Sequence, residues 1–278
     1  MTPPVALTIA GTDSGGGAGI AADLRTFAAH RVFGALAVTA VTAQDTTAVH
    51  RVVALDPAEV EAQIDAVLGD LPVRAAKTGM LATVEILERL VERAEAGRLP
   101  PLVVDPVLVA ASGAALFEGD PAPAYRRLVA RAAVVTPNLP EAEALLGRPV
   151  RDRRAMADAA RRLVDLGAGL ALVKGGHLPG DVALDVAFDG RDLVELAERR
   201  VDTPNVHGTG CTLSAAIAAR LALGEGALDA VAGAKRYVTQ ALAAAASWRL
   251  GAGPGPVDHG VDPPAAQGAR PSRRAGAP

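Results

Sequence analysis

The sequence predicts an α/β protein with a mainly parallel central sheet and helices on both faces of that sheet. Short apolar runs alternate with helical patterns along the chain, half of the 278 residues are hydrophobic, and only 3% are aromatic. Alternation of strands and helices is typical of parallel sheets that are covered by helices. The hydrophobic fraction is large enough to build a sizeable core, mostly from Ala, Val and Leu.

The first elements follow directly from the periodicity of apolar residues. Residues 5–10 are expected to form a strand, and Ile20, Leu24 and Phe27 recur after it at helical spacing. Residues 35–42, rich in β-branched side chains, are expected to form the second strand.

Residues 56–59 predict the start of the next helix. Asp56 would cap it, Pro57 would occupy the first helical position, and Glu59 would close a capping box. Four apolar residues would form its buried stripe: Val60, Ile64, Val67 and Leu68.

The same alternation continues to the end of the chain. Strands are expected at residues 75–77, 102–105, 132–135 and 170–173, and helices at 83–96, 139–147, 153–166, 211–223 and 227–250. Residues 182–196 predict a hairpin around the turn Asp189-Gly190. Ligands of such sheets bind at the carboxyl ends of the strands, so functional residues are expected just after strands.

Composition argues against several classes of protein. Lys and Arg total 28 and Asp and Glu 31, a net charge of -3, whereas a nucleic-acid-binding protein normally has a basic excess. No apolar run approaches the roughly 18 uncharged residues that a membrane helix needs. Residues 1–4 lack the basic region of a secretory signal. The single cysteine, Cys211, excludes an intrachain disulfide. We expect a cytoplasmic protein that binds neither nucleic acid nor membranes.

We expect one domain over residues 1–260 and a disordered tail over residues 261–278. From Gly251 onward the chain is dominated by Gly, Pro and Ala. A segment of this composition buries too little apolar surface to offset the entropy of ordering it.

The segment from His207 to Thr212, His-Gly-Thr-Gly-Cys-Thr, places two glycines directly before a predicted helix. Backbone amides there can converge without obstruction by Cβ atoms, and the helix start adds a partial positive charge. We expect an anion hole suited to a transferring phosphoryl group, with an ordinary glycine-rich helix start as the alternative. Cys211 would have a lowered pKa there and could act as a base toward a hydroxyl group. A buried, inert thiol is its alternative.

Three charged side chains also follow predicted strands. Asp105 and Glu141 offer hard oxygen ligands, which suit Mg²⁺ bound to the phosphates of ATP. Their alternatives are turn formation by Asp105 and helix capping by Asn138 and Glu141. Lys174, in Lys-Gly-Gly-His, could hold a phosphate as a point charge or could simply be solvated beside a turn.

The glycine-rich loop of residues 11–19 is neither a P-loop nor a dinucleotide-binding turn. A P-loop ends in Gly-Lys-Ser/Thr, and that tripeptide does not occur in the chain. Gly17, Gly19 and Ala22 fit G-x-G-x-x-A, but residues 11–16 separate them from the preceding strand. We expect a loop that lets the backbone approach a flat ligand.

Seven motifs follow one another along the chain. They are Ala6-Leu-Thr-Ile-Ala-Gly-Thr-Asp-Ser-Gly-Gly-Gly-Ala-Gly-Ile, Ala21-Ala-Asp-Leu-Arg-Thr-Phe, Lys77-Thr-Gly-Met-Leu, Val104-Asp-Pro-Val, Thr136-Pro-Asn-Leu-Pro-Glu-Ala, Lys174-Gly-Gly-His and His207-Gly-Thr-Gly-Cys-Thr-Leu-Ser-Ala-Ala. Together they resemble the hydroxymethylpyrimidine/phosphomethylpyrimidine kinases, thiamine-biosynthesis enzymes of the ribokinase-like superfamily. The resemblance extends from about Val5 to Gly260 and includes the closing Gly255-Pro-Val-Asp-His-Gly.

The resemblance implies an activity. Enzymes of this family phosphorylate 4-amino-5-hydroxymethyl-2-methylpyrimidine on its hydroxymethyl oxygen, and then phosphorylate the monophosphate to the diphosphate. Both steps use ATP with Mg²⁺, and the enzymes are usually homodimers.

The resemblance also implies the roles of individual residues. The pyrimidine pocket would be lined by Gly11, Asp23, Gln44, Met80 and Val107. The anion hole would comprise Gly208, Thr209, Gly210 and Cys211, with Cys211 as the base where most of the superfamily has Asp. The Asn-x-x-Glu motif of the superfamily is matched by Asn138 and Glu141, which supports magnesium binding. The phosphates of ATP would be bound by Lys174, Asp105 and Asn138, and the metal by Glu141 and Asp105.

Gln44 distinguishes the expected substrate from its closest rival. A side-chain amide presents a donor and an acceptor side by side, which complement an aminopyrimidine edge, and related pyridoxal/pyridoxine kinases tend to lack Gln there. A non-catalytic pyrimidine-binding regulatory protein is a second alternative, disfavoured by the presence of Asp105, Glu141 and Lys174. An NAD-dependent oxidoreductase is disfavoured by the length of the first loop.

Overall fold

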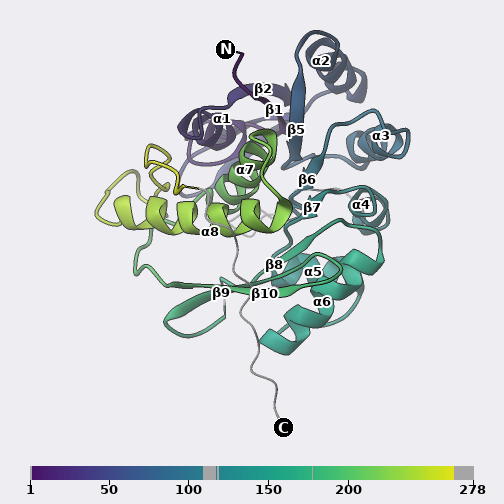
Figure 1. The fold of residues 1–278 in the computed structure, drawn as a ribbon. Helices are drawn as coiled ribbons and strands as arrows, with labels where there is room; N and C mark the ends of the chain where they lie inside the picture. The colour runs from purple at the N-terminus through teal and green to yellow at the C-terminus, as the bar shows by residue number, and fades with distance from the viewer. Residues whose placement is uncertain (1, 109–116, 118, 177, 266–278) are drawn as a thin grey trace.

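The computed structural model describes residues 2–108, 117, 119–176 and 178–265, with an eight-stranded sheet at its centre (Figure 1). The strands of this sheet are β1 (Val5–Ala10), β2 (Phe33–Val38), β5 (Val73–Thr78), β6 (Leu102–Val104), β7 (Val134–Val135), β8 (Ala171–Lys174), β9 (Val182–Phe188) and β10 (Leu193–Arg199). Their order is β10-β9-β8-β7-β6-β5-β1-β2. Neighbouring strands from β8 to β2 are parallel. Strand β9 is antiparallel to both of its neighbours, β8 and β10. The predicted fold class is confirmed.

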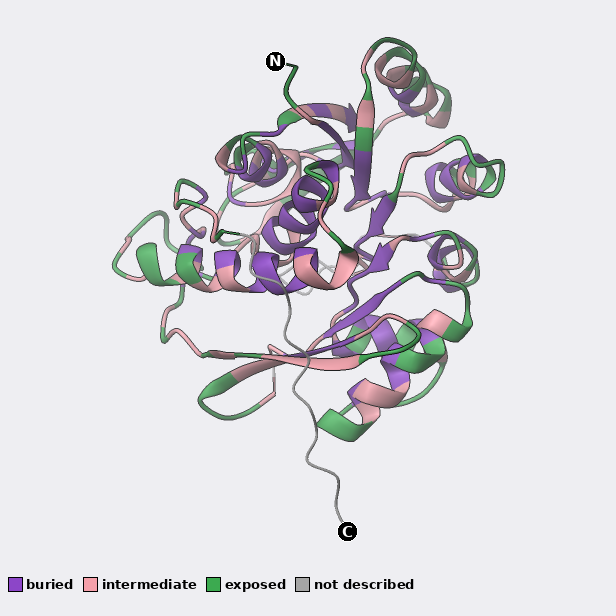
Figure 2. Ribbon diagram, viewed as in Figure 1, coloured by how far each residue is buried: buried purple, intermediate pink, exposed green. Residues whose placement is uncertain are grey.

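Helices cover both faces of the sheet. They are α1 (Gly19–Ala29), α2 (Pro57–Asp70), α3 (Val84–Glu95), α4 (Ala122–Val129), α5 (Leu139–Leu146), α6 (Arg153–Asp165), α7 (Thr209–Ala222) and α8 (Ala227–Ala244). One buried core lies between the sheet and α2 to α6, and a second lies between the sheet and α1, α7 and α8. Figure 2 shows the inner strands and most of α7 as buried, with exposed residues on the outer helices.

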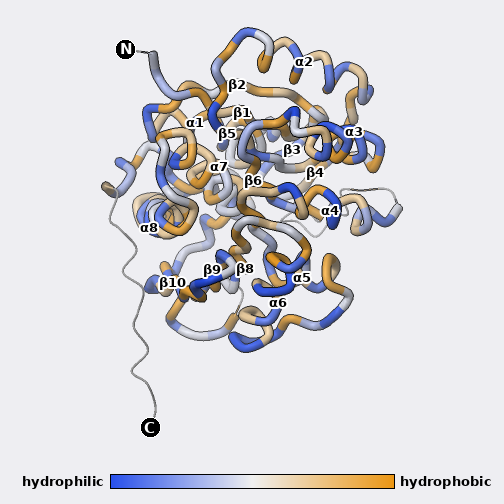
Figure 3. Tube along the Cα trace, turned by 45° about the vertical axis from the view of Figure 1, so that its right-hand side comes forward, coloured by the Kyte–Doolittle hydropathy of each residue, from blue (hydrophilic) through white to orange (hydrophobic). Residues whose placement is uncertain are grey.

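Alternating side chains of each strand supply the two cores. In β1, Leu7 and Ile9 belong to the core under α2 to α6, whereas Ala6 belongs to the core under α1 and α7. The covering helices are amphipathic, and hydrophobic and hydrophilic segments alternate along α3 and α6 (Figure 3). A polar residue on an inner strand must therefore find its partners within the protein, which applies to several residues of the site.

The signals at the ends of several elements are confirmed. Asp56 accepts a hydrogen bond from the Ala58 amide at the start of α2, where Pro57 is the first helical residue. Gly147 ends α5 in the left-handed conformation at φ 66°. Gly190 lies in the turn of the β9–β10 hairpin at φ 91°.

Other expectations about the elements are wrong. Residues 35–42 do not form one strand, because the chain leaves the main sheet at Thr39 and starts a separate hairpin of β3 (Ala40–Gln44) and β4 (Val49–Ala54). Neither β4 nor α4 was predicted; β4 has no buried residue and so lacks an alternating pattern. The last helix ends at Ala244 rather than at residue 250.

The expected division into a domain and a tail stays a prediction. Residues 261–265 have no regular secondary structure, and the rest of the proposed tail lies outside the described residues. None of the helices in the described part of the chain combines the length and the apolar character that crossing a bilayer requires.

Candidate active site

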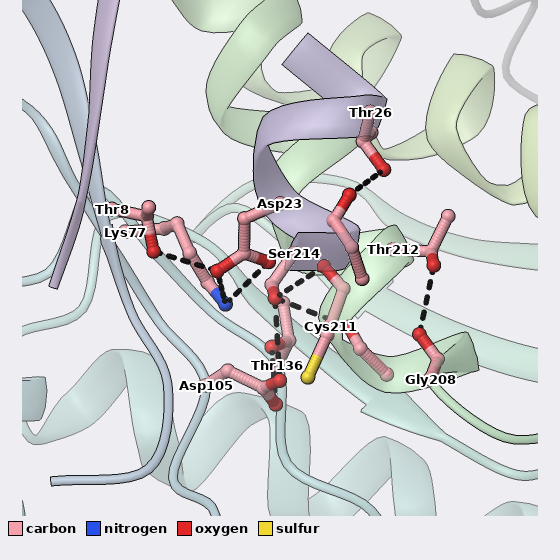
Figure 4. A network of polar contacts seen from close by, with 12 residues as sticks. Thr8, Asp23, Thr26, Lys77, Asp105, Thr136, Gly208, Cys211, Thr212 and Ser214 are labelled. Carbon is pink, nitrogen blue, oxygen red and sulfur yellow. Dashed lines mark hydrogen bonds and ion pairs between the residues drawn. The ribbon is translucent and has the colours of Figure 1, made fainter. Parts of the chain in front are cut away.

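Asp105 joins four elements at the carboxyl edge of the sheet (Figure 4). It follows β6 and is 1% exposed. Its Oδ1 accepts hydrogen bonds from the Thr136 hydroxyl at 3.1 Å, after β7, and from Lys174 Nζ at 2.9 Å, at the end of β8. Its Oδ2 accepts a hydrogen bond from the Ser214 hydroxyl of α7 at 3.2 Å. The buried charge is thus matched by one cation and two hydroxyl donors.

Lys174 lies between the two carboxylates that the sequence predicts for this edge. Its Nζ is 2.9 Å from Asp105 Oδ1 and 3.8 Å from Glu141 Oε2. Burial acts to lower the pKa of Lys174, but Asp105 and Glu141 outweigh it and raise the pKa above its ordinary value. The ammonium group therefore stays charged, as a phosphate-binding lysine requires.

Asn138 and Glu141 cap α5 and also lie at the site, so the two alternatives for them are compatible. Asn138 Oδ1 accepts from the Glu141 amide at 2.9 Å, and Glu141 Oε2 accepts from the Asn138 amide at 2.7 Å. Burial, with a contribution from Asp105, raises the pKa of Glu141 to about 7, although Lys174 opposes the rise.

The two carboxylates fit a Mg²⁺ ion that is bound mainly through a nucleotide. Within the described residues there is no group of three or more His, Cys, Asp or Glu side chains that could hold a metal by itself. Mg²⁺ typically uses one or two protein carboxylates together with phosphate oxygens and water. Asp105 and Glu141, on either side of Lys174, supply such a pair.

The loop before α7 reaches the same place. Gly208 precedes the helix at φ 81°, and a Cβ atom there would lie 1.8 Å from the Gly17 carbonyl oxygen, so only glycine fits. A Cβ atom on Gly210 would lie 3.6 Å from Lys174 Nζ and 3.7 Å from Asp105 Oδ2. The first turn of α7 therefore abuts the Lys174–Asp105 pair, as the sequence predicts.

The amides of this turn are not equivalent. The Thr209 amide donates to the Val206 carbonyl at 3.3 Å and is therefore already engaged. Gly210 and Cys211 follow in the first helical turn, where an α-helix has no internal acceptors for its amides. These two amides are the better donors for an anion. Thr209 therefore contributes less to the anion hole than expected.

Cys211 differs from its expected chemistry. Burial raises the pKa of the thiol to about 11, and the positive charge of Lys77 offsets this only in part. The expectation of a lowered pKa is wrong, because desolvation of the thiolate outweighs the stabilisation that a helix start provides. At neutral pH the side chain is a neutral thiol.

Asp23 also differs from expectation. It is fully buried, and both carboxylate oxygens lie 3.0 Å from Lys77 Nζ. Its Oδ2 accepts a further hydrogen bond from the Thr8 hydroxyl at 2.6 Å. Figure 4 shows this trio behind Cys211 and Asp105. Asp23 therefore does not line a surface in this structure, and it instead holds Lys77 beneath the site.

The expected pyrimidine-binding residues surround the glycine-rich loop. The Gly11 amide donates to the Met80 carbonyl at 3.0 Å, and a Cβ atom on Gly11 would lie 2.4 Å from Met80 Cε. Val107 follows Asp105 in a tight turn, with its amide donating to the Asp105 carbonyl at 2.9 Å.

Gln44 is brought to this loop by the β3–β4 hairpin. The Ser14 hydroxyl accepts a hydrogen bond from the backbone amide of Gln44 and donates one to the backbone carbonyl of Gln44, both at 2.7 Å. Thr42, two residues earlier, is bound to Thr12 through two hydrogen bonds of 2.9 Å. Because side chains two apart on a strand share a face, Gln44 lies on the face of the hairpin that meets the loop.

The residues Asp13 and His207 were not predicted as part of the site. Asp13 Oδ2 lies 2.8 Å from His207 Nε2, and the Asp13 carboxylate accepts from the amides of Gly15, Gly17 and Ala18. Burial acts to raise the pKa of Asp13, but the hydrogen bonds from His207 and these amides lower it. This contact joins the glycine-rich loop to the loop before α7.

Lys77 and Ser214 were also not predicted as site residues. They differ in whether the sequence contains a signal that could have identified them. Lys77 is a charged residue inside an apolar run, Ala75-Ala76-Lys77, and that contrast is a usable signal. Ser214 is a small polar residue within a helix, and the sequence has no feature that marks its contact with Asp105.

We predict that Gly210→Ala lowers the rate of ATP-dependent phosphorylation with little loss of stability. The added methyl group has ordinary contact distances, but it lies beside Lys174 and Asp105, where a phosphoryl group would approach. The rate should fall about 10²- to 10³-fold, the range for losing one anion-hole donor. The measurements are turnover and thermal unfolding.

Gly208→Ala is the matched control, because its Cβ atom would meet the Gly17 carbonyl at a positive φ. This variant should lose stability as well as activity. A Gly210→Ala enzyme with wild-type turnover would contradict a phosphoryl position at this turn.

Comparisons with known proteins agree with this geometry. The chain is 48% identical to the hydroxymethylpyrimidine/phosphomethylpyrimidine kinase of Synechococcus elongatus, over 93% of this chain and 98% of that protein. It superposes on Bacillus subtilis pyridoxal kinase in complex with ADP with a TM-score of 0.85 and 37% identity, covering 93% of this chain and 98% of the other. Staphylococcus aureus pyridoxal kinase in complex with AMP-PCP and pyridoxal gives a TM-score of 0.83 at 36% identity, covering 94% of each chain.

The sequence profile that describes phosphomethylpyrimidine kinase matches residues 13–258. That range contains residues 13–19 of the glycine-rich loop, Asp105, Lys174 and the first turn of α7. The chain belongs to the phosphomethylpyrimidine kinase family.

Proposed function

We propose that this protein transfers the γ-phosphoryl group of ATP to the hydroxymethyl oxygen of 4-amino-5-hydroxymethyl-2-methylpyrimidine, and then phosphorylates the resulting monophosphate to the diphosphate. This is the activity named for its relatives, and it would serve thiamine biosynthesis in the cytoplasm. The observation that carries the proposal is the Lys174–Asp105 pair against Gly210 at the start of α7. It combines a fixed cation, a carboxylate and free helix amides at one point.

The phosphates of ATP are bound by charge and by backbone donors. Lys174 supplies a positive charge, and the amides of Gly210 and Cys211 supply donors at the positive end of the α7 dipole. Phosphoryl transfer requires chiefly positioning and electrostatic stabilisation, which these groups provide. Asn138 holds Glu141 in place through the capping box rather than by binding phosphate itself.

Asp105 and Glu141 would hold the Mg²⁺ ion that accompanies ATP. When bound, the ion neutralises charge on the phosphate oxygens. Lys174, already located between the carboxylates, keeps their mutual repulsion low before the nucleotide binds.

Cys211 accepts the proton of the substrate hydroxyl late in the reaction. Its raised pKa makes the neutral thiol the resting form, so the thiol first loses its own proton to solvent and the thiolate then accepts the proton of the hydroxyl. In a loose transition state little charge develops on the attacking oxygen. A base that is only weakly ionised is therefore sufficient.

The pyrimidine ring lies between the glycine-rich loop and the hairpin. Gly11, Met80 and Val107 offer backbone and apolar surface to the ring, and the Gln44 amide pairs with its amino edge. Asp23 holds Lys77 from below; the charge of Lys77 lowers the pKa of Cys211, whereas the charge of Asp23 acts in the opposite direction.

Pyridoxal phosphorylation is the second candidate function. The close superposition on two pyridoxal kinases favours it, because the same scaffold supports that chemistry. An assay with ATP and a panel of vitamin-precursor alcohols, read by mass spectrometry, tests both functions; no phosphorylated pyrimidine would overturn the proposal.

A homodimer through the β3–β4 hairpin is also proposed. Val41 and Val53 are directly opposite each other on its outer face, and they are 49% and 46% exposed. Paired apolar side chains on an exposed sheet face suit burial against a second copy.

We predict that Cys211→Ala lowers kcat about 10²- to 10⁴-fold, the usual contribution of a general base. Cys211→Asp should retain more activity, because an ionised carboxylate accepts the same proton. The wild-type rate should rise with pH over about pH 7 to 10, as the thiol approaches its pKa of about 11. The Asp variant should lack this rise. Wild-type turnover in Cys211→Ala would show that the thiol is not the base.

We predict that Gln44→Met shifts substrate preference toward pyridoxal. Loss of the amide leaves the buried amino edge of the pyrimidine unpaired, which costs about 1–3 kcal/mol, or about 5- to 160-fold in kcat/KM. Pyridoxal lacks that edge and should lose less. The measurement is the ratio of kcat/KM for the two alcohols. An unchanged ratio would remove Gln44 from the pocket, and a wild type that prefers pyridoxal would favour the second candidate function.

We predict that Val53→Glu converts the wild-type dimer to a monomer, because it places a charge on the proposed contact. Light scattering measures the mass in solution. Val182→Glu is the control, since Val182 is also exposed, at 49%, but lies on β9 in the main sheet. A dimeric Val53→Glu protein, or a monomeric wild type, would contradict the interface.

A further inference from the structure

A further buried ion pair lies next to the end of β8, where Lys174 is the last residue. Lys235 of α8 contacts Asp185 of β9, with Nζ 2.7 Å from Oδ2, and both side chains are buried. The other oxygen of Asp185 accepts a hydrogen bond from the Gly175 amide at 2.9 Å. One oxygen of Asp185 therefore pairs with Lys235 on α8, and the other pairs with the backbone next to Lys174.

Lys174 and Asp185 are directly opposite each other in the antiparallel β8–β9 pair. Opposite residues project to the same face, with Cβ atoms about 4.5–5.5 Å apart. Leu172 and Ala187 lie two residues away on each strand, and both belong to the core under α7 and α8. Asp185 is thus an anion within reach of the Lys174 side chain, on the same face of the sheet.

The Lys174 ammonium nevertheless contacts Asp105 and not its cross-strand neighbour. Lys235 explains this choice, because it compensates the charge of Asp185. Without Lys235, an uncompensated carboxylate would remain in a buried environment, where attraction between opposite charges is strong. Lys174 is the nearest cation that the β8–β9 register offers to it.

The backbone around Lys174 is held independently of this pair. Arg200 donates to the carbonyls of Gly176, Leu178 and Gly180 at 2.6, 2.6 and 2.8 Å. These three carbonyls are thereby held in place, and the remaining freedom lies in the direction of the Lys174 side chain.

We infer that Lys235 is a positioning residue, which neutralises Asp185 so that Lys174 remains directed toward Asp105 and the phosphates of ATP. The inference rests on the proposed phosphate-binding role of Lys174. It requires an asymmetry between the two members of the pair: removing the cation misdirects Lys174, whereas removing the anion does not.

The test compares Lys235→Met, Asp185→Asn and the double variant. Lys235→Met should lower kcat/KM for ATP about 10- to 100-fold, the range for losing one charge-assisted hydrogen bond, with KM for the pyrimidine alcohol nearly unchanged. Asp185→Asn keeps an oxygen for the Gly175 amide and should change kcat/KM for ATP by less than about threefold. The double variant should recover most of the loss, since the competing charge is gone.

Arg93→Met is the matched control. Arg93 is also buried and binds Asp65 and Glu61 between α2 and α3, away from the site. It should lose stability without a change in kcat/KM for ATP. Lys235→Gln still donates a hydrogen bond but has no charge, and it provides the same comparison if Lys235→Met does not fold.

Equal losses in Asp185→Asn and Lys235→Met, or no recovery in the double variant, would overturn the inference and leave the pair as a structural contact. A wild-type protein without ATP-dependent phosphorylation would overturn the proposed function instead.

Discussion

The buried Asp105 carboxylate is the interaction on which the rest of the site depends. It gathers Lys174, Thr136 and Ser214 from three different elements at the edge of the sheet. An ionised carboxylate without partners would cost several kcal/mol in the interior, so these elements are held together by the requirement to satisfy it. The arrangement that we propose for phosphate binding is thereby part of what stabilises the fold.

A second constraint joins the two glycine-containing loops. Asp13 accepts hydrogen bonds from the amides of its own loop and contacts His207 of the other. Gly208 can approach the Gly17 carbonyl only because it has no Cβ atom, and a Cβ atom on Gly17 would meet the His207 ring at 2.6 Å. These contacts set the spacing between the loop at the ring and the loop at the phosphate, before any ligand binds.

Membership of the family leaves the choice of acceptor alcohol to a small part of the structure. The chain superposes on a pyridoxal kinase over 93% of its length, while its sequence matches the phosphomethylpyrimidine kinase family. The hairpin that presents Gln44 lies outside the main sheet and contacts the site chiefly through hydrogen bonds to the glycine-rich loop. A scaffold of this kind can keep its phosphoryl chemistry while side chains on the hairpin change the substrate.

The sequence by itself determined the features that depend on short-range signals: the parallel α/β class, most element ends, and the capping box of Asn138 and Glu141. The motif spacing also placed the charged residues after the correct strands. Only the tertiary structure decided which of these residues meet. Lys77 and Asp23 are 54 residues apart and pair because α1 packs on β1, which is the neighbour of β5 in the sheet. The raised pKa of Cys211 results from burial by elements distant in sequence, and local patterns do not encode such desolvation.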